Sequence, residues 1–421
     1  MRRPIAIDLF SGCGGMSLGL EAAGFDIAAA VELDPIHTLV HHVNFPYSVS
    51  ICQDINHLKT QKLMTQIKQK GFSCEVDLIA GGPPCQGFSH IGKRQLDDPR
   101  NSLVFQYVRI IKDLKPKYFI FENVPGIASG QHRQFLDELI SEFKRIGYVI
   151  AQPIKILDAS RFGAPQKRKR LILIGSRKDV KPAHYPLETH QETEANINPV
   201  NTVGDAIADL ANIPAFVHQD RGIDASKLDY SGLRKSFALH PSAAYYLCHK
   251  RKNDGQVWGH IGSNHTAKST TRFLLTEPGT VEKTSRFFKL SPSGLCNTLR
   301  AGTSSDRGAH TAPRPIHYRE PRCITIREAA RLHTFPDWFQ FHRTIWHGFR
   351  EIGNAVIPML SKCLGDEIIE CLNIDLNTLE IKDLPEVDSQ YLTYNMGQAS
   401  AYWDVPDDVI AKRKKVIKNV A

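Results

Sequence analysis

The sequence predicts an α/β protein with a doubly wound, mostly parallel sheet and a smaller, irregular second domain. Up to about residue 180, short apolar runs alternate with helical stretches, which is the pattern of strands joined by crossover helices. From residue 181 to about 321 the chain is rich in Pro, Gly, Ser, Thr, Asn, Arg and His, and apolar periodicity is scarce. Helical order returns after Ile324.

The strands are predicted from short apolar runs that end in Gly, Pro or an acidic residue. These runs are residues 5–10, 27–31, 76–80, 118–121 and 171–175. The clearest helical stretches are residues 16–23, 103–114, 326–332 and 357–371. Gly24 closes the first of them, as expected for a helix C-terminus.

Composition excludes several classes of protein. The chain has 421 residues, 42% hydrophobic and 23% charged, which fits a globular protein of one large or two smaller domains. No apolar run approaches about 18 residues, so no membrane span is expected. Asp8 interrupts the first apolar run, which is poor material for a signal peptide. The net charge of +9 suggests a polyanionic partner without establishing one.

Cysteine and histidine spacing gives no metal site. Nine cysteines occur without a Cys-x-x-Cys pair, which indicates reduced thiols in a cytoplasmic protein. Twelve of the eighteen histidines lie between His184 and His347, but they lack ligand spacing and Cys or carboxylate partners. We therefore expect neither a disulfide framework nor a bound metal.

Cys85 follows a proline pair at the end of the predicted strand 76–80. In an open α/β sheet the carboxyl ends of the strands form the edge where ligands bind. A thiol on a rigid turn at that edge is a candidate nucleophile. The alternative is that Cys85 is a small buried apolar residue, which is the commoner role of cysteine.

A glycine-rich turn, residues 10–15, joins the first strand to the first helix. Its glycines allow a ligand to approach the backbone, and the helix offers free N–H groups. Glu32 ends the next strand, where an acid commonly binds ribose hydroxyls. The spacing is not G-x-G-x-x-G, so NAD, FAD and an adenosyl cofactor all remain open. Asp54 could hold an adenine or simply cap a helix.

Glu122 ends the strand 118–121, at the same edge as Cys85. Its alternative role is to cap the following turn. A thiolate beside a carboxylic acid suggests covalent attack with proton donation. On a pyrimidine, the thiolate would add to C6 while the acid donates to N3, and C5 would become nucleophilic.

Residues 166–170 read Gln-Lys-Arg-Lys-Arg and approach the strand 171–175. Strand alternation places Gln166, Arg168 and Arg170 on one face and the two lysines on the other. We expect one face to meet the active site and the other to meet solvent or phosphate. A basic strand end exposed to water is the alternative.

Taken in chain order, these motifs resemble those of the DNA (cytosine-5) methyltransferase family. The matching stretches are 8–15, Glu32, 54–55, 82–89, 101–111, 122–124, 166–170, 325–332, 335–337 and 353–356. One departure is Ile357, where relatives usually carry proline. The resemblance implies a Rossmann-like methyltransferase fold that uses S-adenosylmethionine.

The resemblance also implies residue roles. Cys85 would attack C6 of a flipped-out cytosine in duplex DNA, and Glu122 would protonate N3. Arg168 would hold the carbonyl at C2, and Arg170 would orient Glu122 through a charge-assisted bond. The base that removes the C5 proton is not identified. The implied cofactor contacts are Phe10, Ser11, Gly12, Gly14, Gly15, Glu32, Asp54, Ile55, Pro84, Leu103, Asn354 and Val356.

The same resemblance divides the chain into three parts. These are residues 1–180 for catalysis and cofactor, 181–343 for target recognition with a hinge, and 344–421 returning to the catalytic domain. Base readout favours Arg, Lys, Asn or Gln, although most such side chains contact phosphate or nothing. The candidates are Arg272, Lys283, Arg286, Arg300 and Arg307, with Ser89, Lys93 and Arg94 in a loop that could close on DNA.

The expected partner is double-stranded DNA. A cognate restriction endonuclease is expected from the single-chain, bacterial-type layout. The protein is expected to be monomeric. Three alternatives remain. A tRNA cytosine methyltransferase would share the chemistry, but the long segment 181–320 suits DNA readout better. A flavin or nicotinamide oxidoreductase leaves Cys85 and Glu122 unexplained, and a non-catalytic DNA-binding module is disfavoured by the same two residues. The basic run 412–415 fits a solvated helix face or a frayed end.

Overall fold

The computed structural model describes residues 3–84, 102–130, 132–191, 198–229, 249–250, 255–302, 314–378 and 380–410. Several residues singled out from the sequence lie outside this part of the chain. They are Cys85, Ser89, Lys93, Arg94, Arg307 and the basic run 412–415.

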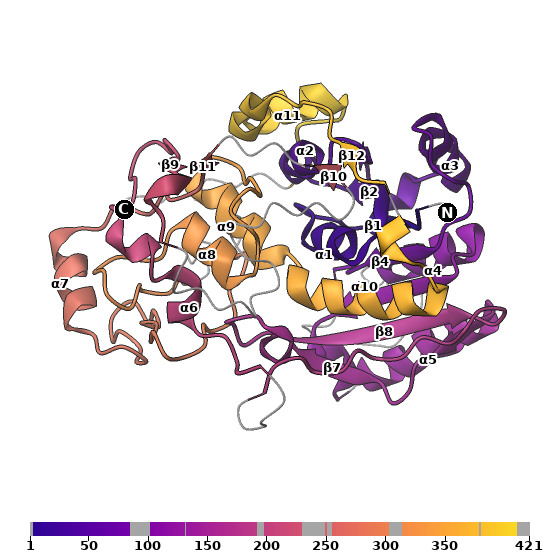
Figure 1. Cartoon of the computed structure of the whole chain (residues 1–421), viewed down its shortest axis with the longest axis horizontal. Coiled ribbons are helices and arrows are strands. Elements are labelled where there is room, and N and C mark those ends of the chain that lie inside the picture. Colours follow the sequence, from indigo (N-terminus) through magenta and orange to yellow (C-terminus); the bar gives the residue numbers. More distant parts are fainter. Residues whose placement is uncertain are drawn as a thin grey trace, which may run out of the picture.

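A sheet of eight strands forms the core of the part of the molecule that lies on the right in Figure 1. The strand order is β3-β2-β1-β4-β5-β8-β6, and β7 also pairs with β8. Neighbours from β3 to β5 are parallel, whereas β8 runs antiparallel to β5, β6 and β7. The strands are β1 (Ile5–Leu9), β2 (Asp26–Glu32), β3 (Val49–Cys52), β4 (Leu78–Gly81), β5 (Tyr118–Asn123), β6 (Tyr148–Ile150), β7 (Lys155–Asp158) and β8 (Lys169–Arg177).

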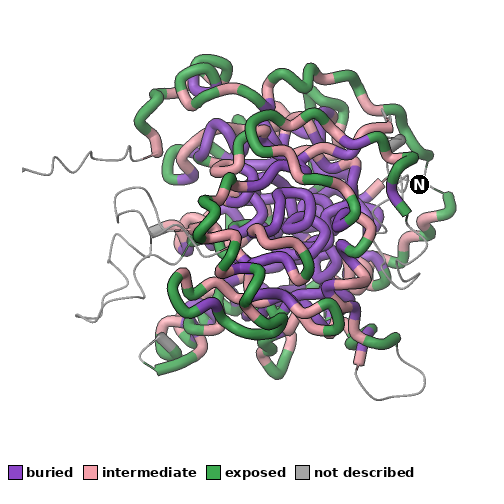
Figure 2. The backbone as a smooth tube through the Cα atoms, turned by 90° about the vertical axis from the view of Figure 1, so that its left-hand side faces the viewer, coloured by how far each residue is buried: buried purple, intermediate pink, exposed green. Residues whose placement is uncertain are grey.

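Helices cover both faces of the sheet, so its strands are almost continuously apolar. One face packs on α1 (Gly15–Ala23) and α10 (Pro358–Leu372). The other face packs on α3 (Thr60–Gln69), α4 (Ser102–Leu114) and α5 (His132–Arg145). Figure 2 shows the resulting buried centre of the molecule. The predicted doubly wound, mostly parallel sheet is confirmed, and the predicted strands and helices match observed elements within a few residues.

The segment after residue 180 has few regular elements, as predicted. Its helices and strands are α6 (Val203–Ile207), β9 (Ile223–Asp224), β10 (His249–Lys250), β11 (Gln256–Val257) and α7 (Ala267–Leu275). The next helix, α8 (Ile326–Leu332), anchors this segment through buried charges. Arg331 pairs with Asp337 (2.7 Å) and Asp209 (2.6 Å), and the Arg327 guanidinium donates to Trp258 O. These contacts of two buried guanidinium groups make α8 the structural support of the segment.

The last part of the chain returns to the first. It contains α9 (Ile345–Asn354), α10, β12 (Lys382–Asp383), a 3₁₀ turn (Ser389–Thr393) and α11 (Met396–Trp403). α10 lies directly on α1, because a Cβ at Gly19 would be 2.3 Å from Pro358 O. α11 packs on α2 (Pro35–Asn44), and the Trp403 indole donates to Pro35 O (3.1 Å; Figure 1). The sequence analysis did not predict α9.

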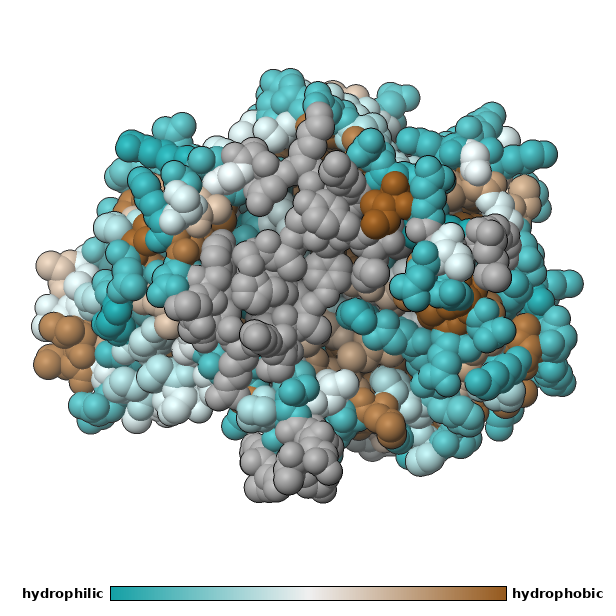
Figure 3. Space-filling model, viewed as in Figure 1, coloured by the Kyte–Doolittle hydropathy of each residue, from teal (hydrophilic) through white to brown (hydrophobic). Residues whose placement is uncertain are grey.

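Figure 3 shows a face that is largely hydrophilic, with scattered apolar patches. Leu274 and Leu275 of α7 are among the exposed large apolar side chains. Among the described residues, no helix combines the length and apolar character needed to cross a bilayer.

Candidate active site

The carboxyl ends of the parallel strands bring the predicted site residues to one edge of the sheet. Strand order reverses between β1 and β4, which is the position where open α/β sheets bind ligands. The turn after β1, Glu32 at the end of β2 and Asp54 after β3 lie on one side of that point. Pro83 and Pro84 after β4 and Glu122 in β5 lie on the other side. One edge therefore holds both the cofactor motif and the catalytic motif.

The glycine-rich turn is held in place by Glu32. Gly12 N–H donates to Glu32 Oε2 (2.9 Å), and the N–H groups of Leu33 and Asp34 donate to Oε1 (2.9 Å each). The turn needs left-handed backbone at Phe10 (φ 60°) and Gly12 (φ 54°). Because the Glu32 carboxylate holds the turn in place, Glu32 and the turn would present their ligand-binding groups in a fixed relative position.

The features of this turn fit an adenosyl cofactor. Ser11 Oγ is buried and has no hydrogen-bond partner among the described residues, so it is a polar atom left for a ligand. Gly14 precedes α1 in a left-handed conformation and has no side chain to cap the first helix N–H groups, of which Ser17 N–H donates to Asp8 Oδ2 (3.1 Å). Asp54 Oδ1 accepts from Asn56 N (2.9 Å) and caps a 3₁₀ turn, Ile55–His57, so the predicted capping role is confirmed. Its contact with adenine stays a proposal.

The C-terminal motif closes against the same turn. A Cβ on Gly15 would lie 2.3 Å from Val356 O and 2.9 Å from the Cβ of Ala355. Glycine at position 15 is therefore required by close packing. Asn354 is exposed at the end of α9, Val356 is buried, and Leu103 is half-buried in the first turn of α4.

Glu122 and Arg170 form the best-defined charged contact at the catalytic edge. Arg170 Nε lies 2.7 Å from Glu122 Oε1, and the two side chains are 15% and 12% exposed. The other oxygen of Glu122 lies against the turn after β4, since a Cβ on Gly82 would be 2.7 Å from Oε2. Asn123 Nδ2 donates to Pro83 O (3.2 Å). The Glu122 carboxylate therefore lies beside the turn that leads into Cys85, and Asn123 joins the end of β5 to that turn.

Arg168, which the sequence predicts to hold a base carbonyl, has its guanidinium bonded to carbonyl groups of the protein instead. It is 3% exposed, and its guanidinium donates to Leu299 O (2.8 Å), Gly353 O (3.0 Å) and Ala355 O (3.0 Å). Burial and the nearby Arg170 lower the pKa of Arg168. Through its two terminal nitrogens Arg168 joins β8 to the C-terminal motif and to residue 299, while its buried Nε has no hydrogen-bond partner among the described residues.

Gln166 strengthens the same junction. Its amide donates to Leu332 O (3.2 Å) and accepts from Leu299 N–H (3.1 Å). His333 Nε2 lies 3.0 Å from Ala355 O, a carbonyl that can only accept, so Nε2 carries the proton and Nδ1 accepts from Gln166 Nε2. The predicted alternation is confirmed, with Gln166, Arg168 and Arg170 turned inward and Lys167 and Lys169 exposed.

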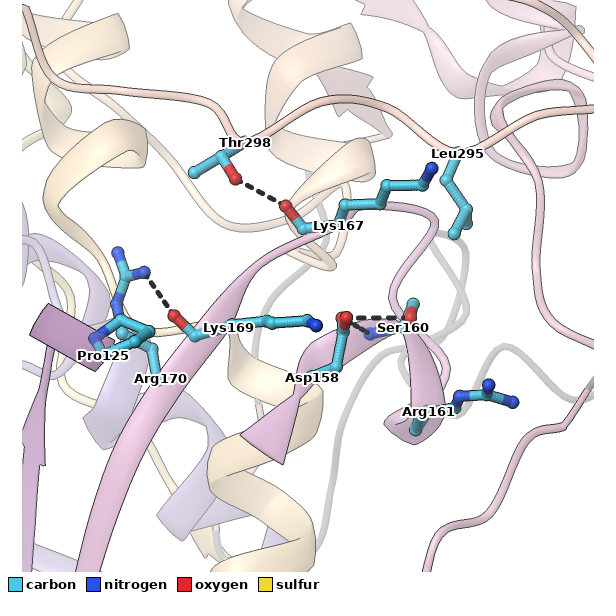
Figure 4. Close-up of a pocket in the computed structure, with 9 residues that line it drawn as sticks. All are labelled: Pro125, Asp158, Ser160, Arg161, Lys167, Lys169, Arg170, Leu295 and Thr298. Carbon is cyan, nitrogen blue, oxygen red and sulfur yellow. Dashed lines mark hydrogen bonds between the residues drawn. The ribbon is translucent and has the colours of Figure 1, made fainter. Parts of the chain in front are cut away.

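The exposed lysines line a pocket that the sequence analysis did not find. The pocket has a volume of about 580 Å³ and also contains Arg170 (Figure 4). From the sequence, Lys167 and Lys169 are expected only to face solvent or phosphate, and Arg161 is not among the predicted site residues. The signal that could have indicated the pocket is the density of basic residues within residues 161–170.

Asp8 was not predicted as a site residue. Ser17 Oγ donates to Asp8 Oδ2 (2.6 Å), and burial raises the pKa of Asp8 to about 7.

The recognition candidates have different environments. Arg272 is paired with Glu282 (3.4 Å) in α7 and the loop beyond it. Arg300, Lys283 and Arg286 are exposed. Among the described residues, no group of three or more His, Cys, Asp and Glu side chains is arranged to hold a metal ion.

Comparison with known proteins agrees with this geometry. Residues 5–370 match the family model described as C-5 cytosine-specific DNA methylase. The chain is 42% identical over 440 residues to the Type II methyltransferase M.XorII of Xanthomonas oryzae pv. oryzae, covering 100% of this chain and 97% of that protein. It is 32% identical to the Type II methyltransferase M1.HphI of Haemophilus parahaemolyticus, covering 86% of each.

Two solved structures are also similar. A prophage-encoded DNA modification methyltransferase from E. coli has a TM-score of 0.70 and 33% identity, covering 88% of this chain and 100% of that chain. The S. pombe Dnmt2 methyltransferase, with a TM-score of 0.56 and 16% identity, covers 89% and 100% and shares the fold. The chain belongs to the C-5 cytosine-specific DNA methylase family and is a DNA cytosine-5 methyltransferase.

Proposed function

We propose that the protein methylates C5 of a cytosine in a specific double-stranded DNA sequence, through a covalent bond between Cys85 and C6 of the base. The observation that carries this proposal is the position of the Glu122 carboxylate. It is held by Arg170 and lies against Gly82, three residues before Cys85. A proton donor is thereby fixed beside the segment that bears the nucleophile.

The proposed steps use the side chains of this edge. The Cys85 thiolate forms a bond to C6, and Glu122 delivers a proton at N3, so electron density moves to C5. The turn 10–15, Glu32 and residues 354–356 would hold S-adenosylmethionine, which would supply an electrophilic methyl group. C5 forms a bond to this methyl group as the bond from sulfur to the methyl carbon breaks, and S-adenosylhomocysteine is the leaving group. A base, for which water is the simplest choice, then removes the C5 proton, and the bond from Cys85 to C6 breaks. The cytosine must leave the base stack to reach these groups, at a cost of a few kcal/mol.

Arg168 takes a positioning role in this proposal. Two of its three carbonyl contacts hold residues 353–355, which pack against the cofactor turn, and the third is to Leu299 O. Arg170 keeps Glu122 oriented through a charge-assisted hydrogen bond. Neither side chain needs to contact the base for this role.

The test incubates the protein with methyl-labelled S-adenosylmethionine and either duplex DNA or tRNA. We expect label on DNA, and label on tRNA alone would overturn the choice of substrate. Cys85→Ser should lose transfer while cofactor binding remains. A duplex with 5-fluorocytosine at the target should leave a denaturation-resistant protein–DNA adduct, because fluorine cannot leave C5 as a proton does. Absence of an adduct with an active enzyme would contradict the covalent step.

We propose a cytoplasmic role in a Type II restriction–modification system, for which the support is that the relatives are named Type II methyltransferases. Such a role implies a nuclease that cleaves the same sequence when it is unmethylated. Sequencing of methylated positions in DNA from cells that express the protein would give the recognition sequence. A nuclease encoded beside the gene should cleave that sequence, and methylation by this protein should block cleavage.

A further inference from the structure

The pocket beside the Glu122–Arg170 pair is formed by three parts of the chain that are distant in sequence. They are Pro125 after β5, residues 158–170 from the end of β7 to the start of β8, and residues 295–298. Its lining residues are Pro125, Asp158, Ser160, Arg161, Lys167, Lys169, Arg170, Leu295 and Thr298. Figure 4 shows Lys167 and Lys169 extending from the same side of the chain, while Arg170 lies on the other side.

The lining carries an excess of positive charge. Four lining residues are cationic and one, Asp158, is acidic. Arg170 is balanced by Glu122, whereas Arg161, Lys167 and Lys169 have no ion pair or side-chain hydrogen bond with any residue that the structure describes. Three uncompensated cations around one pocket favour an anionic occupant.

The only acidic lining residue already has local partners. Asp158 Oδ1 accepts from Ser160 N (3.2 Å) and Ser160 Oγ (3.0 Å), and so caps a 3₁₀ turn, Ala159–Phe162. The role of Asp158 is therefore to fix the turn that presents Arg161, and its charge is partly offset by those donors.

The backbone that carries the cations is also fixed. Lys167 N–H donates to Cys296 O (2.8 Å), and Thr298 Oγ1 donates to Lys167 O (2.6 Å). Arg161 O accepts from Thr189 N–H and His190 N–H (3.0 Å each). The charged groups thus extend from a backbone held by hydrogen bonds at Arg161 and at Lys167, which reduces the entropy lost on binding.

We propose that this pocket binds phosphodiester groups of the DNA strand beside the target cytosine, an inference that rests on the proposed function. Duplex DNA carries one negative charge per about 1.7 Å, so several phosphates pass any surface of this size. Phosphate contacts set the register of a protein on DNA and carry no sequence information. Because Arg170 belongs both to the pocket and to the Glu122 pair, phosphates held here lie next to the base to be methylated.

The experiment measures DNA affinity against salt concentration for Arg161→Gln, Lys167→Gln, Lys169→Gln and the triple variant. The slope of log affinity against log salt should fall by about 0.9 for each phosphate that a variant no longer neutralises. The fall in affinity should be equal for cognate and non-cognate duplexes, and cofactor affinity should not change. Lys62→Gln, on the exposed side of α3, removes the same charge outside the pocket and should leave the slope unchanged.

An unchanged salt slope in the triple variant would overturn the proposal. A fall in affinity for the cognate duplex alone would also overturn it, because it would show that these side chains read bases and not phosphates. Inorganic phosphate, compared with chloride at equal ionic strength, should compete with DNA for the wild type more than for the triple variant. If phosphate binds but the DNA slope is unaffected, the pocket is a site for free anions and the proposal fails. A wild type that transfers no methyl group to DNA would instead refute the proposed function.

Discussion

Arg170 Nε lies 2.7 Å from Glu122 Oε1, across the antiparallel pair of β5 and β8. This strand pair is where the sheet stops being parallel. β5 delivers the carboxylate at its carboxyl end, and β8 enters from the opposite direction to deliver the guanidinium. Reversal of one strand is thus what allows an acid and its orienting cation to meet at the catalytic edge.

Glu122→Gln should lower kcat for methyl transfer by about 10²- to 10⁴-fold, because it removes the proton donor and keeps the shape of the side chain. Arg170→Ala should lower kcat by about 10²-fold through misplacement of the carboxylate. Single-turnover transfer of labelled methyl to DNA measures both, and cofactor affinity should be unchanged. Glu370→Gln, exposed on α10, is the control. Full activity in Glu122→Gln would remove Glu122 from the mechanism.

Gly15→Ala should weaken cofactor binding by about 1–3 kcal/mol, since the new methyl group would overlap Val356 O and force residues 354–356 outward. Isothermal titration with S-adenosylmethionine measures the change. Gly262→Ala is a matched control, because a Cβ there makes ordinary contacts at 3.6 Å and 3.9 Å. Equal affinities for both variants would show that the close packing at Gly15 does not shape the cofactor site.

Arg168→Lys should destabilise the protein despite keeping the charge. One ammonium group cannot replace the three guanidinium contacts, and a buried carbonyl left without a donor costs about 1–3 kcal/mol. Ala355 O would keep His333 Nε2 as a donor, so the cost arises at Leu299 O and Gly353 O. Urea unfolding measures the change in stability. Arg133→Lys, an exposed pair with Asp137, should unfold like the wild type. If Arg168→Lys is as stable as the wild type, the planar guanidinium group is not what joins β8 to residues 299, 353 and 355.

Glu351 gives a prediction about pH. Burial, with the nearby Asp34, raises the pKa of Glu351 from its ordinary 4.5 to about 8. Between these values the native protein keeps a proton that the unfolded chain has released, so this group lowers stability as pH rises, by at most about 1.4 kcal/mol per pH unit. Glu351→Gln should therefore gain stability relative to the wild type from pH 5.5 to 8.

Urea midpoints at pH 5.5, 7 and 8.5 measure this difference. The exposed-site variant Glu370→Gln should follow the wild type at every pH. A constant offset between Glu351→Gln and the wild type would mean that Glu351 is ionised in the native protein throughout this range.

The sequence predicted the sheet because its strands are buried on both faces and leave continuous apolar runs, such as residues 118–121. Alternation in residues 166–170 predicted which side chains turn inward, and Arg170 meets Glu122 as expected. These features depend on local spacing. α9 was not predicted because Gly348 and Gly353 interrupt a helix whose buried face includes only a few apolar side chains, among them Phe349 and Ile352.

What could not be predicted depends on distant segments. Arg168 binds carbonyls of residues 299, 353 and 355, and nothing in its own neighbourhood indicates that tertiary folding brings them there. The cationic pocket likewise needs residues 295–298 to pair with Lys167. The roles of Cys85 and of the DNA-contacting residues stay predictions.

The contact between Gly15 and Val356 has a consequence for timing. The two residues are 341 positions apart in the sequence (356 minus 15). At about 5–20 residues per second, a ribosome makes Val356 roughly 17 to 70 seconds after Gly15. Until then the turn that should receive the cofactor has no partner to pack against. We therefore expect a nascent chain to complete its cofactor site, and with it to gain activity on DNA, only after most of its synthesis is done.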